Sequence, residues 1–119
     1  MNRLCFCLEI RTQTGEPIVT VYVVQEPNAD KNILSATDFG ELQMILPARE
    51  NMMFSPAPTV SKIKTALKDY SDDDYILCIG DPAAIGIAIH YALMANRQRV
   101  KILKWDRREY RYYPVEVET

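Results

Sequence analysis

The chain of 119 residues is poor in the side chains that hold metals or form disulfide frameworks, because it contains one histidine and three cysteines. Cys5 and Cys7 would share one face of a strand, and Cys78 has no other cysteine near it in the sequence. A set this small and odd in number argues against a disulfide framework, and a zinc site would need more thiols or histidines. We expect buried apolar cysteines, no metal and no cofactor.

Long apolar runs are also absent. No stretch reaches the length of a membrane-spanning helix, and charge appears at Glu9 and Arg11, too early for the apolar region of a secretory signal. A content of 48% hydrophobic and 25% charged residues is typical of one globular domain with a real core. We expect a single α/β domain over residues 1–119, without a membrane partner and located in the cytoplasm.

Glycine is scarce as well, and neither phosphate-binding pattern, G-x-G-x-x-G or G-x-x-x-x-G-K-[ST], occurs. The turn Gly80-Asp81-Pro82 is typical of a helix start, with Asp81 as N-cap and Pro82 as the first helical residue. A ligand site is the alternative, because parallel sheets bind ligands beyond the carboxyl ends of their strands. The rim of such a site would consist of Ser55, Thr59, Gly80 and Asp81, although the Asp81 carboxylate would repel a phosphate.

Hydrophobic periodicity predicts six strands and two helices. The strands are expected at residues 3–12, 18–27, 40–47, 75–80, 99–105 and 110–118, and the helices at residues 56–70 and 82–96. Three consecutive aspartates before the fourth strand should form a solvated turn. Pro114 cannot donate to a sheet ladder, so the last strand should lie at an edge or carry a bulge.

These elements predict an α/β fold with a small mixed sheet. Strands joined through helices are expected to be parallel, which makes residues 41–105 a parallel β-α-β-α-β unit with residues 75–80 as its central strand. An N-terminal β-hairpin and a C-terminal β-hairpin would extend the sheet with antiparallel strands.

The helix expected over residues 82–96 is apolar around most of its circumference, and His90 lies on its narrow polar strip as a surface residue. Alanines recur at every fourth position, so another backbone can approach one side closely. Tight packing on the sheet is one explanation, and packing against a second copy across a two-fold axis is the other. We predict a homodimer with the interface residues Ala84, Ile87, Ala88, Tyr91, Ala92 and Ala95.

The net charge of −2 conceals a basic segment, because residues 97–111 contain seven cations and two acids, 7 − 2 = +5. Aromatic residues are interleaved with these cations, as in surfaces that track nucleic acid backbones and stack bases. The alternative is an exposed hairpin that cations and proline protect from edge aggregation, which the acidic overall balance favours. Nucleic acid would contact Lys104, Trp105, Arg107, Arg108 and Arg111.

The segments GDPAAIG at residues 80–86 and LKWDRREYRYYPVEV at residues 103–117 resemble a family of small tailed-bacteriophage proteins. The resemblance extends over residues 55–118, and the N-terminal hairpin lies outside it. It implies a phage origin and expression in the cytoplasm of a host, and it carries no catalytic residues to this chain.

No catalytic constellation stands out in the sequence. We therefore expect a non-enzymatic phage-type accessory or interaction protein, a homodimer that binds a host protein or nucleic acid. The alternative is a small nucleotide-binding or hydrolytic α/β enzyme with its site at the C-terminal ends of the parallel strands.

Overall fold

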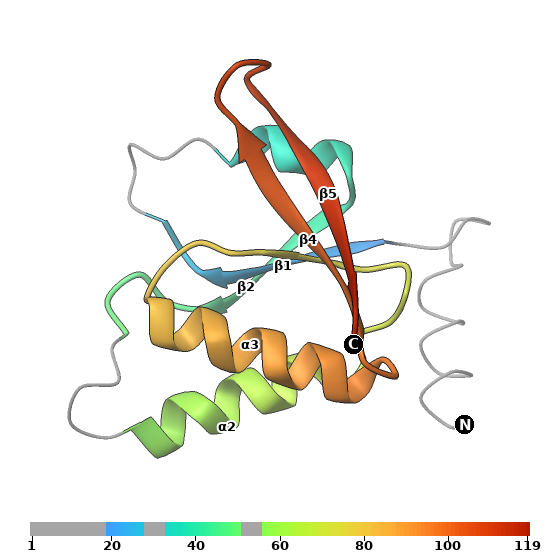
Figure 1. Ribbon diagram of the computed structural model, residues 1–119. Coiled ribbons are helices and arrows are strands. Elements are labelled where there is room, and N and C mark those ends of the chain that lie inside the picture. The colour runs from blue at the N-terminus through green and yellow to red at the C-terminus, as the bar shows by residue number, and fades with distance from the viewer. Residues whose placement is uncertain (1–18, 28–32, 51–55) are drawn as a thin grey trace.

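The computed structural model describes residues 19–27, 33–50 and 56–119. Its centre is a five-stranded sheet in the order β2-β1-β3-β4-β5, in which β1 to β4 run parallel and β5 runs antiparallel to β4 (Figure 1). The strands are β1 (Thr20–Gln25), β2 (Glu41–Leu46), β3 (Tyr75–Leu77), β4 (Arg99–Asp106) and β5 (Arg111–Glu118).

The two faces of this sheet are covered unequally. The helices α2 (Pro56–Leu67) and α3 (Pro82–Ala95) lie side by side on one face (Figure 1). The 3-10 helix η1 (Leu34–Asp38) lies on the opposite face and contributes Ala36 to a smaller core there. On this face β5 contacts η1, and its residue Tyr112 belongs to the same smaller core.

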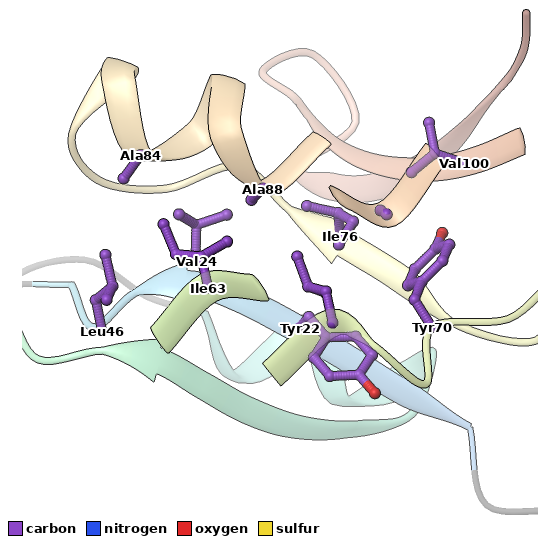
Figure 2. Packing of buried hydrophobic residues seen from close by; sticks show 11 residues of the cluster. Tyr22, Val24, Leu46, Ile63, Tyr70, Ile76, Ala84, Ala88 and Val100 are labelled. Carbon is purple, nitrogen blue, oxygen red and sulfur yellow. The ribbon is translucent and has the colours of Figure 1, made fainter. Parts of the chain in front are cut away.

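The two cores alternate along β1. Tyr22 and Val24 point toward the helices, where Ile63 of α2 and Ala88 of α3 meet them (Figure 2). The intervening side chains point to the η1 face, as the two-residue period of a strand requires. The residues buried on that face are Val21, Val23, Ile33, Ala36, Leu77, Leu103 and Tyr112. β1 is thus buried on both sides, as is usual for an inner parallel strand.

The predicted α/β fold is confirmed in its mixed sheet, its two helices and its C-terminal hairpin. β3 lies in the middle of the strand order, as expected. β5 is an edge strand, which explains how it accommodates Pro114. The register from Arg99 opposite Glu118 to Asp106 opposite Arg111 is continuous, so β5 carries no bulge.

The predicted N-terminal hairpin is wrong for its second strand. The residues expected to form it become β1, and both edges of β1 pair with parallel strands, β2 and β3. The expected partner strand, residues 3–12, lies outside the described residues. The reason is that β1 and β2 are joined by a crossover connection that contains η1, and such a connection makes the two strands parallel. A tight turn would have made them antiparallel.

The aspartate turn before β3 is solvated only in part, contrary to the expectation. Asp74 is fully buried, and its carboxylate accepts hydrogen bonds from the main-chain amides of Ser71 and Thr20. Its carbonyl accepts from the Tyr70 hydroxyl, which in turn accepts from the Lys101 amide at 2.9 Å. Asp74 therefore ties the end of the helix layer to the amino ends of β1 and β4.

Candidate functional site

The carboxyl ends of β1 and β3 form the position where sheets of this order usually bind ligands. The chain leaves β1 toward η1 on one face and leaves β3 toward α3 on the other, which opens a crevice between the two strands. A hollow of about 400 Å³ lies here. Its lining residues are Gln25, Glu26, Pro27, Ala48, Cys78, Ile79 and Gly80.

Gln25, the last residue of β1, fills the base of this crevice and is 6% exposed. Its Nε2 amide donates to the carbonyl oxygens of Glu50 at 2.7 Å, Pro47 at 3.1 Å and Ala48 at 3.3 Å. Its Oε1 accepts from the main-chain amide of Asp81 at 2.8 Å. A single side chain therefore joins the loop after β2 to the turn after β3.

Gly80 is required by this arrangement. Its φ of +121° is a conformation that residues with a side chain rarely adopt. A Cβ built on it would lie against the side chain of Gln25, 2.6 Å from Oε1. The glycine of the GDP turn therefore makes room for Gln25 and not for a phosphate.

Asp81 is the N-cap of α3, as predicted, and Pro82 opens the helix. The Asp81 carboxylate accepts from the Ala83 amide at 2.9 Å, while the Asp81 amide already donates to Gln25. Two of the amides at this helix start, which would bind an anion, are thus bonded within the chain.

Thr59 faces Glu50 from the first turns of α2. Its hydroxyl donates to the Glu50 carboxylate at 2.6 Å, and the Lys62 ammonium donates to the same carboxylate at 2.9 Å. These two donors hold the pKa of Glu50 below its ordinary value of 4.5. Ser55, the remaining residue of the predicted rim, lies outside the described residues. Through Gln25 and Glu50 the structure links Thr59 to the GDP turn in one hydrogen-bonded network.

A second and larger hollow, about 990 Å³, lies beyond the end of β3. It forms because β4 continues to Asp106, whereas Leu103 is the last β4 residue with a register partner in β3. The lining is mainly apolar. The residues are Ile33, Ser35, Leu77, Cys78, Ile79, Ile102, Leu103, Lys104, Trp105, Tyr110, Tyr112 and Val115. We call this feature the hairpin hollow.

Three aromatic rings line one side of the hairpin hollow. Trp105 packs edge to face with Tyr112, with ring centroids 5.0 Å apart, and with Tyr110 at 6.5 Å. Tyr112 is nearly buried, which raises the pKa of its hydroxyl. Trp105 and Tyr110 are 39% and 78% exposed, so two large rings remain open to a partner.

The cations of the predicted nucleic acid surface surround the tip of the β4–β5 hairpin, and all of them are exposed. With Asp106 and Glu109 included, the tip carries 4 − 2 = +2 charges. The structure describes ion pairs at Glu50 and Asp72, and none at these four cations. They are Lys104, Arg107, Arg108 and Arg111.

The prediction of a dimer surface on α3 needs a correction, because three of its alanines are buried. Ala84, Ala88 and Ala92 are fully buried within one chain and belong to the core between the sheet and the two helices. Figure 2 shows Ala84 and Ala88 facing this core. All three alanines were wrong as interface residues, because their small side chains serve close packing inside the fold. Ile87 and Tyr91 are half-buried at the edge of this core.

The outer face of α3 is different in character. It exposes Ala95 of the predicted interface together with Gly86, His90 and Met94, and the Met94 side chain is 60% exposed. A Cβ on Gly86 would meet no atom within 4 Å. His90 lies at the surface as predicted, its ring against that of Tyr91.

Sequence reasoning missed Gln25 and the hairpin hollow. Gln25 is an ordinary polar residue at the end of a strand, and only its position between the loop after β2 and the turn after β3 gives it a role. The hollow depends on β3 ending at Leu77, three residues before the expected end at Gly80. Within the described ranges, no group of three potential metal ligands occurs and no helix is long and apolar enough to cross a membrane.

Comparison with known proteins finds one family. A family model described as "Phage Pam3 gp32-like protein" matches residues 19–119, which include every described strand and helix. Neither the curated proteins nor the solved structures include a significant match. The phage resemblance inferred from the sequence is thereby supported at the level of the family.

Proposed function

The chain belongs to the phage Pam3 gp32-like family, and from this membership we propose that it is a non-enzymatic interaction protein that acts in the cytoplasm of the host. Its partner macromolecule docks on the hairpin hollow. The observation that carries this proposal is the combination of an apolar hollow, two exposed aromatic rings and four cations that have no ion pair among the described residues, all on one hairpin. Exposed apolar surface of this kind is typical of interaction sites.

The alternative, an enzyme at the carboxyl ends of the parallel strands, has less support. The polar groups there bond to one another, as Gln25 does to Asp81 and Thr59 to Glu50. A nucleotide present at a hundred times its dissociation constant would add about 2.7 kcal/mol to the stability. We expect no such rise in melting temperature across a panel of nucleotides, and a reproducible rise would favour the enzyme.

Site-specific photocrosslinking tests the docking surface. The photoreactive residue p-benzoylphenylalanine replaces either Tyr110, beside the hairpin hollow, or Lys64, an exposed residue of α2 on the other side of the sheet. Both variants are irradiated in host cells. We expect a discrete crosslinked species from position 110 and none from position 64. Equal crosslinking at the two positions, or none at position 110, would contradict the proposal.

We also propose that the protein is a homodimer through the outer face of α3. No Asp, Glu, Lys or Arg occurs between Pro82 and Ala95, and a helix that is apolar around most of its circumference is usually covered on more than one side. Asp81 precedes the helix and Arg97 follows it, so an antiparallel second copy would bring opposite charges together at both ends. This complementarity favours a second copy as the occupant of the face.

Light scattering of three proteins tests the dimer. Wild type should have the mass of two chains at micromolar concentration. Gly86→Glu should have the mass of one chain, because its side chain enters open space within the protomer but charges the interface. The control Thr65→Glu, on the exposed side of α2, should remain dimeric. A monomeric wild type would refute this part of the proposal.

A further inference from the structure

The shape and charge of the hairpin hollow indicate which kind of macromolecule it binds. We propose that it takes an extended, acidic segment of a partner protein, anchored by an aromatic or branched apolar side chain. The inference rests on the proposed function and deepens it, because it names the chemistry of the partner at the same site.

The apolar anchor follows from the walls of the hollow. Leu77 and Leu103 form part of its lining, and both are almost fully buried, at 2% exposure. Trp105 and Tyr110 stand at one side with much of their surface exposed. A volume of about 990 Å³ lined in this way accommodates large apolar side chains, and aromatic contacts at such positions commonly carry most of the binding energy.

The extended form of the segment follows from the edge of β4. From Lys104 to Asp106 this strand has a partner in β5 but none in β3. A peptide in β conformation can pair with such a stretch, so that alternate side chains enter the hollow. Beside it, the Ser35 hydroxyl lines the hollow and is buried without a hydrogen-bond partner among the described residues. It offers a polar contact to the main chain of a bound segment.

The acidic character of the bound segment follows from the uneven distribution of charge along the β4–β5 hairpin. Its tip carries the four cations, which have no ion pair within the part of the chain that the structure describes, whereas its base carries Glu116 and Glu118 opposite Lys101 and Arg99. A short acidic segment can contact the tip without approaching the base. A long polyanion running along the hairpin would gain no net attraction at the base, where two glutamates offset two cations.

The arrangement of the rings also favours a peptide over single-stranded nucleic acid. Trp105 lies opposite Tyr112 on one face of the hairpin, while Lys104 and Arg111 occupy register positions on the other face. Bases stacked on Trp105 would therefore not be followed by a row of cations on the same face. In addition, Trp105 packs edge to face with two tyrosines, which leaves no open stack of rings.

The first experiment compares four labelled probes by fluorescence polarisation with the purified full chain at low salt. They are the peptides Glu-Asp-Trp-Ile-Val-Asp-Glu, Lys-Arg-Trp-Ile-Val-Arg-Lys and Glu-Asp-Ser-Gly-Ser-Asp-Glu, and oligothymidylate. We expect the first peptide to bind at least tenfold more tightly than the others, about 1.4 kcal/mol. The second lacks the charge complementarity and the third lacks the anchor.

Three variants locate the binding. Arg107→Ala with Arg108→Ala should weaken binding of the acidic peptide about two- to fivefold per cation, and most strongly at low salt. The matched control, Lys64→Ala with Lys68→Ala, removes the same charge from α2 and from the turn that follows it, and should change affinity by less than about twofold. Tyr110→Asn should weaken binding at least about tenfold, since asparagine tolerates the φ of +53° at this position but lacks the ring.

Each result decides between alternatives. Tighter binding of oligothymidylate, equal binding of the basic peptide, or equal losses in the two double variants would overturn the inference. Absence of binding by all four probes would overturn it too. If crosslinking from position 110 still identified a macromolecular partner, the proposed function would stand while its acidic, apolar chemistry would be wrong. Circular dichroism of each variant confirms that the fold is retained.

Discussion

Gln25→Met is the substitution that most directly tests how the carboxyl edge of the sheet is held. Methionine has nearly the volume of glutamine, so the replacement creates no large cavity. It removes one acceptor, for the Asp81 amide, and one donor group, for the carbonyls of Glu50, Pro47 and Ala48. The loop after β2 and the turn after β3 then lose the side chain that joins them.

The expected cost is worked out from the two shortest of these bonds. Loss of the 2.8 Å bond leaves the Asp81 amide unsatisfied at a half-buried position, which costs about 1–2 kcal/mol. Loss of the 2.7 Å bond to the Glu50 carbonyl costs about 0.5–1.5 kcal/mol. Pro47 and Ala48 are exposed, so water replaces their weaker bonds. The sum is about 1.5–3.5 kcal/mol, a large part of the 5–15 kcal/mol typical of a domain.

Urea unfolding followed by circular dichroism measures this change in the free energy of unfolding. The matched control is Gln43→Met, the same substitution at an exposed position of β2, where we expect a change within about 0.5 kcal/mol. If the two variants were equally stable, the hydrogen bonds of Gln25 would not hold this edge together, and the reasoning would be refuted.

Four further predictions concern backbone and titration. Gly86→Ala should raise the free energy of unfolding of the protomer by about 0.5–1 kcal/mol, because within one protomer the new methyl meets no atom within 4 Å and alanine favours the helix. Gly80→Ala should lower it by about 1–3 kcal/mol, owing to its φ of +121° and the contact with Gln25; urea unfolding distinguishes the two signs. The lowered pKa of Glu50 stabilises the fold above its ordinary value of 4.5, so stability should fall as the pH drops below that value, and Glu50→Gln should flatten this acid limb in urea titrations. Burial raises the pKa of Tyr70 above its ordinary value of 10.0, so stability should fall as the pH rises past that value, and Tyr70→Phe should leave the tyrosinate absorbance of the folded protein unchanged there.

The sequence was most informative where one physical signal dominated. The GDP turn combines a preferred N-cap with proline at the first helical position, and the structure shows both roles. Pro114 restricted its strand to an edge, where β5 lies. Local chemistry of this kind does not depend on what the rest of the chain does.

Sequence reasoning failed where the outcome depended on which element covers which surface. The alanines of α3 give the helix a smooth side that suits close packing inside the fold as well as contact with a second copy. Only their burial shows that they pack inside the fold. The β-branched run of β1 suits an outer hairpin strand or an inner parallel strand equally well. Its place depends on η1, whose short 3-10 turn has no clear periodic pattern.

The crevice between β1 and β3 and the hairpin hollow differ in whether their side chains find partners within the described chain. At the crevice between β1 and β3, the side chains of Gln25, Glu50 and Thr59 have hydrogen-bond partners in neighbouring loops. At the hairpin hollow, the Ser35 hydroxyl has no partner among the described residues and Tyr110 is 78% exposed. Folding alone gives no reason to keep a buried hydroxyl unpaired or a large ring in water. Such departures from local rules concentrate at functional surfaces, so they support the proposal that a partner docks on the hollow.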